Sequence, residues 1–447
     1  MSSVLATLRR MLAEHGAPGD GYCVAFSGGL DSMVLLHALH SLRGGPHRFT
    51  LRAVHIHHGL HPDADAWSAR CEAVAAQLDV AYVAHRVTVE RDSGEGLEAA
   101  ARRARYAAFA ELLRADEQLL TAHHEEDQLE TYLLRLLRGA GVHGLASIVE
   151  RAPFANGWLL RPLLIVGRVD LTAYAQAHGL NWIEDPSNTD TTLDRNYLRH
   201  NVIPLLRARW PGMAATIGRA ARLSAEAAEL IDGLAAGDCA RIVHAGLIDL
   251  RELRTLAPPR QRNVIRHVLR QRGLHPPSEM QLLTGLDQLL SAGEDRHPVL
   301  HWPGGQVRRY RQRLYVLEED PSVATDDAPV EFAWDGSAPI DLGPVRGRVQ
   351  LVSAETGGFC IDPANGPLTI RFRRGGERLR EADHRHHILL KKLYQERGVV
   401  PWMRSHVPLL AQGDTLLAVG DFWSRTGATA DGHPAVRVVW DRHPIIQ

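Results

Sequence analysis

Lysine is almost absent from this chain of 447 residues. Of its 51 basic residues, only the neighbours Lys391 and Lys392 are lysines, and arginine supplies the positive charge elsewhere. Two interpretations are equally open. Either a general preference for arginine has left two lysines by chance, or this place requires a compact ammonium group in preference to a planar guanidinium.

Cysteine and long apolar runs are also scarce. The four cysteines lie far apart and form no Cys-x-x-Cys pair, which excludes a small disulfide scaffold and favours a reducing compartment. Residues 1–21 lack the apolar centre of a signal peptide, and no stretch has the length of a membrane span. These absences predict a soluble, cytoplasmic protein with no membrane partner.

The first half of the chain alternates short apolar runs with helical patterns, as in α/β proteins with a parallel sheet. Strands are expected over 22–26, 51–56, 81–89, 119–122 and 159–164, and helices over 33–42, 64–78, 97–114, 125–137 and 169–178. Ligands of such a sheet bind beyond the carboxyl ends of the strands.

The second half changes pattern twice. Residues 204–290 are mainly helical, with the clearest helices over 213–234 and 260–272, followed by a strand over 306–317 and an acidic linker over 318–329. The remainder has short strands and one helix, over 388–397. We therefore expect an α/β domain at 1–210, a helical domain at 211–325 and a small α+β domain at 330–447.

The sharpest motif follows the first expected strand and opens the first expected helix. It reads Ser27-Gly28-Gly29-Leu30-Asp31-Ser32. Glycines let backbone amides approach phosphate oxygens, and the helix N-terminus adds partial positive charge. Hydroxyls of the two serines can bind phosphate as well, and Asp31 can hold Mg²⁺. A glycine-rich turn without a ligand is the alternative, which the serines and the aspartate disfavour.

This hexapeptide resembles the SGGxDS motif of the PP-loop ATP pyrophosphatases, which cleave ATP to AMP and pyrophosphate. The resemblance implies an adenine nucleotide alpha-hydrolase-like fold with ATP and Mg²⁺ as ligands. His55, at the end of the second strand, is expected to line the nucleotide pocket. A zinc site in the histidine-rich stretch around it is rejected, because no cysteine lies nearby and a strand divides alternate residues between its two faces.

Further motifs narrow the resemblance to the tRNA(Ile)-lysidine synthetase family. They are His55–Leu60, Glu98 with Arg102, Arg105 and Tyr106, Ala122–Thr131, Gly144-Leu145, Arg161–Leu164, Trp182–Asn188, Arg195–Arg199 and, near the C-terminus, Leu390–Leu393 with Gly398 and Pro401-Trp402. The resemblance implies that ATP adenylates the first anticodon cytidine of tRNA(Ile), that free L-lysine displaces AMP, and that codon reading changes from AUG to AUA.

The chemistry of that reaction indicates which side chains to expect. Because a lysine amine has a pKa of about 10.4, freeing it at neutral pH costs roughly 4.6 kcal/mol, and nearby carboxylates can bind it and accept its proton. His123, Asp127 and Glu130 share one helix face if the helix begins near His123; an acidic, solvated helix start is the alternative. Arg105 and Arg195 are candidates for stabilising phosphoryl charge. With Asp31, these five residues are the predicted catalytic set.

Positive charge is concentrated although the net charge is only −1. Residues 195–222 contain six arginines and no carboxylate, and residues 371–404 contain ten basic against four acidic residues. A charge run is usually a solvated face, but such zones beside a phosphate loop favour contact with the RNA backbone. The predicted tRNA-binding residues are Arg199, Arg207, Arg373, Arg374, Lys391 and Lys392.

Three rival functions remain to be weighed. Sulfur transfer to tRNA usually requires paired cysteines, which are absent, and a glutamine-dependent synthetase would need an amidotransferase nucleophile, for which no region is evident. A non-catalytic RNA-binding protein would not need the intact Ser27, Asp31, Asp127 and Glu130. A homodimer is compatible with the sequence, which leaves the oligomeric state open.

Overall fold

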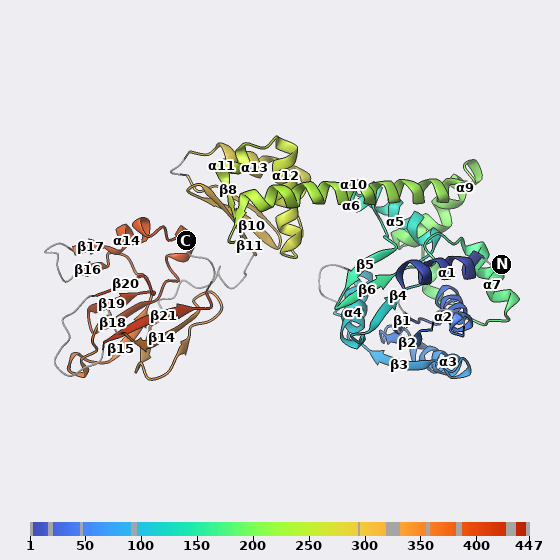
Figure 1. Cartoon of the computed structure of the whole chain (residues 1–447), viewed down its shortest axis with the longest axis horizontal. Coiled ribbons are helices and arrows are strands. Elements are labelled where there is room, and N and C mark those ends of the chain that lie inside the picture. Colours follow the sequence, from blue (N-terminus) through green and yellow to red (C-terminus); the bar gives the residue numbers. More distant parts are fainter. Residues whose placement is uncertain are drawn as a thin grey trace. The chain divides into compact units, whose positions relative to one another are not determined.

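The computed structural model (Figure 1) describes residues 3–16, 21–44, 48–90, 96–293, 296–318, 331–354, 358–380, 387–425 and 435–443. The chain divides into two compact units, Met1–Leu234 and Ala235–Gln447, and each is described by itself. Except for residue 318, the expected acidic linker lies outside the described residues. Within the described part, no helix combines the length and the apolar character that crossing a membrane requires.

The first unit is built on a six-stranded sheet with the order β3-β2-β1-β4-β6-β5. Its strands are β1 (Gly21–Ala25), β2 (Thr50–His57), β3 (Ala81–Arg86), β4 (Glu117–Leu120), β5 (Arg151–Phe154) and β6 (Gly157–Leu160). Neighbouring strands are parallel from β3 to β6, and β5 is an antiparallel edge strand. The predicted parallel sheet is confirmed, and β5 is an addition to it.

Helices cover both faces of this sheet, as alternating strand residues require. Tyr22 and Val24 of β1 belong to a core that α1, α2 and α7 complete, whereas Cys23 belongs to a second core with α4. The helices are α1 (Ser3–His15), α2 (Leu30–Leu42), α3 (Ala64–Gln77), α4 (Leu97–Leu112), α5 (Glu125–Leu137) and α7 (Arg168–Ala177). Helix α1 was not among the expected elements.

The position of the site follows from the strand order. The chain moves outward from β1 to β2 and β3 and then returns to the other side of β1 as β4. The loops that leave β1 and β4 therefore diverge at this point of the sheet, and such a reversal opens a crevice at the carboxyl ends of the strands. The loop of residues 27–32, called the phosphate loop from here on, follows β1, and the start of α5 follows β4.

A helical segment that follows α7 in the chain packs against α5. It comprises α8 (Asp194–Tyr197), a π-helical turn η2 (Leu198–Val202), α9 (Ile203–Arg209) and the start of α10 (Met213–Ile242). Leu129 of α5 forms a small core with Leu198, Ile203 and Met213. This apolar contact holds the segment, with its arginines, next to the acidic residues of α5.

The second unit begins with helices and a five-stranded antiparallel sheet of the order β7-β8-β11-β10-β9. These elements are β7 (Val243–His244), β8 (Leu247–Asp249), α11 (Leu250–Arg254), α12 (Pro258–Gln271), α13 (Glu279–Ser291), β9 (Val299–Trp302), β10 (Gly305–Tyr310) and β11 (Arg313–Leu317). The single strand expected over 306–317 is wrong. Arg311, with φ 54°, turns the chain, and the two halves pair as an antiparallel hairpin.

The rest of this unit contains two further antiparallel sheets, β12-β15-β18-β19-β20 and β13-β14-β21, a short pair β16–β17 and the helix α14 (Leu390–Glu396). The strands are β12 (Phe332–Trp334), β13 (Ile340–Asp341), β14 (Arg348–Ser353), β15 (Leu368–Arg371), β16 (Arg378–Arg380), β17 (His387–Leu389), β18 (Leu409–Gln412), β19 (Thr415–Val419), β20 (Trp423–Ser424) and β21 (Val436–Asp441). The predicted mixture of strands and one helix is confirmed here.

Candidate active site

The phosphate loop connects β1 to α2 in a conformation that alanine cannot easily copy. Gly28 has φ 82°, and a Cβ there would lie 2.6 Å from Ile183 Cδ1 and 2.7 Å from Cys71 Sγ. Ser27 Oγ and Ser32 Oγ lie 3.0 Å apart, and Ser32 Oγ donates to the carbonyl of Gly29. The loop is therefore held by its own hydroxyls and leaves the amide end of α2 for an anion.

Asp31, in the first turn of α2, faces the start of α5. Its Oδ2 lies 3.6 Å from His124 Nε2, whereas its Oδ1 is buried and has no hydrogen-bond partner among the described residues. A buried carboxylate oxygen without a partner is costly unless a ligand completes it. Together with the hydroxyls of the loop, this oxygen fits Mg²⁺, which prefers carboxylate, phosphate and water oxygens.

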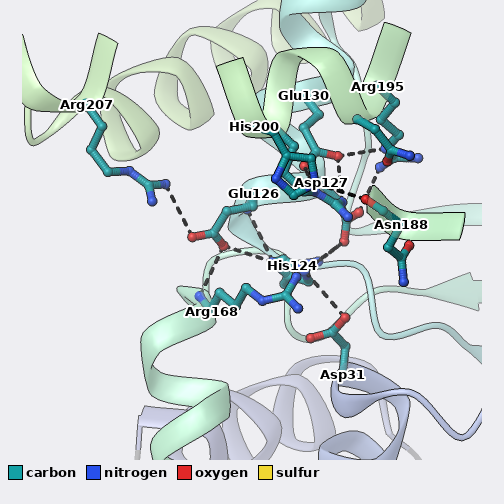
Figure 2. A network of polar contacts seen from close by, with 12 residues as sticks. Asp31, His124, Glu126, Asp127, Glu130, Arg168, Asn188, Arg195, His200 and Arg207 are labelled. Carbon is teal, nitrogen blue, oxygen red and sulfur yellow. Dashed lines mark hydrogen bonds and ion pairs between the residues drawn. The ribbon is translucent and has the colours of Figure 1, made fainter. Parts of the chain in front are cut away.

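His124 is the central cation of the site (Figure 2). Its Nδ1 lies 3.0 Å from Glu126 Oε2, and its Nε2 lies 3.4 Å from Asp127 Oδ2, in addition to the contact with Asp31. Burial alone would lower the pKa of His124, but the carboxylates of Asp31 and Glu126 raise that pKa to about 10. The positive charge of the imidazolium thus stabilises the carboxylates of Asp31, Glu126 and Asp127 close together beside the phosphate loop.

Sequence reasoning selected His123 and overlooked His124. The helix begins at Glu125, so His124 is its N-cap residue and its backbone amide donates to Asp127 Oδ2 at 3.0 Å. His123 lies outside the helix, where its Nδ1 is 2.8 Å from Thr121 Oγ1. Burial lowers the pKa of His123 to about 3, so it is neutral at physiological pH. The helix expected over 125–137 already begins at Glu125, but the spacing of four and three residues from His123 to Asp127 and Glu130 directed attention to His123 instead of the N-cap residue.

Glu130 and Asp127 are joined to the helical segment by arginines. Arg195 donates from Nε to Glu130 Oε2 and from Nη2 to Asp127 Oδ1, both at 2.7 Å. Arg199 donates to both oxygens of Glu130, at 2.6 and 3.0 Å. The side chain of Glu130 is 0% exposed and that of Asp127 is 16% exposed. Asp127 is therefore the more exposed of the two carboxylates, although its Oδ1 pairs with Arg195 and its Oδ2 with His124, whereas Glu130 is enclosed by two guanidinium groups.

Glu126 extends the network away from the phosphate loop. It accepts from the backbone amide of Arg168 at 3.1 Å, and its Oε1 accepts from Arg207 Nη2 at 3.3 Å. The structure thus brings two predicted tRNA-binding residues, Arg199 and Arg207, to the acidic face of α5. Figure 2 shows the contacts of His124 with Asp31, Glu126 and Asp127, and the contact of Glu126 with Arg207.

Further arginines, among them Arg102 and Arg105, lie near His123 and Arg195. Arg105 lies over the ring of Tyr106 at 5.8 Å and forms no ion pair with any described residue. Burial lowers its pKa, and the neighbouring positive charges of Arg102 and Arg195 lower it further. A buried guanidinium that has no ion pair with a described carboxylate favours an anionic ligand, so the position of Arg105 is compatible with its predicted role.

The remaining predicted residues lie as follows. His55 Nδ1 is 2.9 Å from the carbonyl of Phe26, the residue that precedes the phosphate loop, and Leu30 is buried under that loop. Lys391 and Lys392 are exposed on α14. Arg373 and Arg374 lie in the same unit, just after β15. No cluster of His, Cys, Asp and Glu residues able to hold a metal occurs within the described ranges.

The charge of His124 predicts how stability depends on pH. Its pKa of about 10 in the folded state exceeds the ordinary value of 6.5, so its stabilising contribution is complete below pH 6.5 and is lost as the pH rises to 10. We expect His124→Gln to lose less stability over this range than the wild type, by at least about 1 kcal/mol. Thermal unfolding in metal-free buffer measures this difference.

His123→Gln is the matched control for this titration. Because His123 has a pKa of about 3 in the folded state, its protonation in that state does not change between pH 6.5 and 10. Parallel pH profiles for the wild type and His124→Gln would contradict the assigned charge of His124.

Comparisons with known proteins agree with this arrangement. The chain matches a PP-loop domain over residues 2–206, a TilS substrate binding domain over 248–315 and a TilS substrate C-terminal domain over 368–440. It is 46% identical to the tRNA(Ile)-lysidine synthase of Alkalilimnicola ehrlichii over 98% of this chain and 97% of the relative. The corresponding enzyme of Methylococcus capsulatus is 43% identical over 90% of this chain and 92% of its own length. That of Salmonella paratyphi B is 41% identical over 98% of each.

Proposed function

Because the chain belongs to the tRNA(Ile)-lysidine synthase family, an ATP-using ligase family, we propose that it ligates free L-lysine to the first anticodon cytidine of tRNA(Ile) with a CAU anticodon. ATP first adenylates the ring carbonyl oxygen of this cytidine and releases pyrophosphate. The ε-amine of lysine then attacks the ring carbon and displaces AMP. The product, lysidine, reads AUA in place of AUG.

One observation carries this proposal: the phosphate loop and the carboxylates of α5 meet beyond the carboxyl ends of β1 and β4, with His124 between them. The loop provides backbone amides and hydroxyls for the phosphates, and Asp31, with one oxygen free, would hold Mg²⁺ against them. Bound Mg²⁺ would neutralise phosphate charge. Arg105 and Arg195 supply positive charge for the phosphoryl group that is transferred.

The exposure of the carboxylates supports a division of roles. The lysine amine must lose a proton before it attacks, and a carboxylate within reach can bind the ammonium and accept that proton. Asp127 is partly exposed although its oxygens accept from Arg195 and from the backbone amide of His124, whereas the fully buried Glu130 accepts from Arg195 and Arg199. We therefore assign the contact with lysine to Asp127 and the positioning of Arg195 and Arg199 to Glu130.

The cysteines of the first unit, which holds the phosphate loop, argue against the nearest rival, a thiolating enzyme. Such an enzyme needs an accessible thiolate. Cys23 and Cys71 are buried, and burial raises the pKa of each thiol to about 12. Neither thiol is suited to carry sulfur.

The decisive experiment incubates the protein with ATP, Mg²⁺, radiolabelled lysine and a tRNA(Ile) transcript. We expect label in the RNA and equal amounts of AMP and pyrophosphate, and neither with a transcript whose first anticodon base is uridine. Label that depends on a sulfur donor would favour thiolation. RNA binding without AMP would favour a non-catalytic role, and either result would contradict the proposal.

Lys391 and Lys392 are proposed to contact the tRNA backbone. Both are exposed in α14, and Lys392 Nζ lies 3.7 Å from the carboxylate of Glu396. Replacing both by alanine should weaken tRNA binding about 5- to 20-fold and reduce the slope of log affinity against log salt by about 2, since each phosphate contact releases counterions. Filter binding over a salt series measures both quantities.

The double Lys→Arg variant separates the two explanations for these lysines. If charge alone matters, arginine at positions 391 and 392 will restore both affinity and salt slope. If a compact ammonium is required, the slope will return but the affinity will not. An unchanged affinity and slope in the alanine variant would remove these residues from the tRNA interface.

A further inference from the structure

A bridging loop, residues 183–190, connects the phosphate loop to the segment that carries the site arginines. At its first end, the amide of Ile183 donates to the carbonyl of Gly28 at 2.9 Å. Ile183 Cδ1 also fills the space where a Cβ of Gly28 would lie. The backbone of the phosphate loop is therefore bonded to this loop.

At its other end the bridging loop is held by Asn196. Both hydrogens of Asn196 Nδ2 are used, for the carbonyl of Ser187 at 3.0 Å and for that of Asp190 at 2.9 Å. Asn196 is only 7% exposed. His200 adds a contact from its Nε2 to the carbonyl of Asn188 at 2.9 Å, as Figure 2 shows.

Asn196 lies next to Arg195 in α8, and the π-helical turn with Arg199 follows directly. Arg195 is also held by Asp127 and Glu130. When Arg195 binds phosphoryl oxygens, it can keep those carboxylate contacts only in part. The backbone of Arg195 must then be held by a contact in which no charged group of the site takes part.

We propose that Asn196 is a positioning residue that aims Arg195 by bonding α8 to the bridging loop, and through it to the phosphate loop. The inference rests on the proposed function for the role of Arg195. The anchor itself depends on geometry alone. Carbonyl acceptors suit an amide donor, and a small displacement of a phosphoryl-binding group can cost about 100-fold in rate.

The first test measures the anchor without any reaction. We expect Asn196→Ala to accelerate backbone amide exchange of residues 194–202 at least about tenfold, while the amides of the α5 core keep their protection. Asn201→Ala is the matched control, because Asn201 lies in the same turn but is exposed and has no side-chain partner among the described residues. Unchanged exchange in Asn196→Ala would overturn the proposal, whatever the activity.

The second test is a double-mutant cycle on AMP release with tRNA and lysine. Asn196→Ala should lower kcat about tenfold and change the KM for ATP less than about twofold, but it should have no further effect in an Arg195→Ala background, because it acts through Arg195. An equal loss in both backgrounds would overturn the proposal.

Two further controls separate the other outcomes. If Asn196→Ala fails to fold, His200→Ala removes the exposed second anchor, and the same two measurements should change in the same direction by a smaller factor; no change would overturn the proposal. If the wild type releases no AMP, the proposed function fails, whereas the exchange measurement still decides the anchor.

Discussion

Replacing Gly28 by alanine is expected to reduce ATP-dependent AMP release by at least about 100-fold, through loss of the phosphate-binding conformation. At φ 82° an alanine is strained by about 1–2 kcal/mol. In addition, its Cβ would overlap with Ile183 Cδ1 and Cys71 Sγ. The loop must move, and its amides then leave the positions that bind phosphate. Calorimetric titration with a non-hydrolysable ATP analogue measures the loss of binding directly.

The neighbouring glycine provides the comparison for this prediction. A Cβ on Gly29 meets nothing closer than Ser27 Oγ at 3.6 Å, and φ at this position is −72°. Gly29→Ala should therefore keep the loop conformation and lose much less affinity for the nucleotide. Equal losses in the two variants would mean that approach of the backbone to phosphate, rather than the φ angle and packing of Gly28, is limiting.

Periodic patterns in the sequence were enough to predict the sheet and most helices around the site. The helix α5 has its expected bounds, 125–137, because three acidic residues mark its first turn and leucines at helical spacing mark its buried face. The strand expected over 306–317 was wrong because apolar alternation continues through the turn at Arg311, where no glycine marks the reversal.

Pairings between distant residues were beyond the sequence. Arg199 was predicted to bind tRNA from a run of arginines, and the structure pairs it with Glu130, 69 positions earlier. A run of arginines in the sequence does not show which carboxylate each arginine will pair with in the folded protein. Similarly, the start of α5 was expected at residue 125, but the sequence pattern could not show that His124, rather than His123, lies among the carboxylates of Asp31, Glu126 and Asp127.

Asp127→Asn and Glu130→Gln should separate chemistry from positioning. Asp127→Asn is expected to lower lysine incorporation by about 10²–10⁴-fold, because an amide cannot accept the proton of the lysine amine. The substitution should also cost stability, because it removes the charge that pairs with Arg195 and His124, but less than Glu130→Gln, since the amide oxygen can still accept from the backbone of His124 and the side chain is partly exposed. Incorporation of labelled lysine, together with thermal unfolding, tests both statements.

Glu130→Gln should affect both measurements. Glu130 is fully buried and balances two guanidinium groups, so its loss leaves positive charge without a partner and should cost about 2–4 kcal/mol. For a unit of this size we expect a fall in the unfolding temperature of roughly 5–10 °C. Lysine incorporation should fall as well, because Arg195 loses a partner that orients it. A Glu130→Gln protein of unchanged stability, or an Asp127→Asn protein that still incorporates lysine at the wild-type rate, would contradict this division of roles. In the second case, a carboxylate other than Asp127 would have to bind the lysine amine and accept its proton.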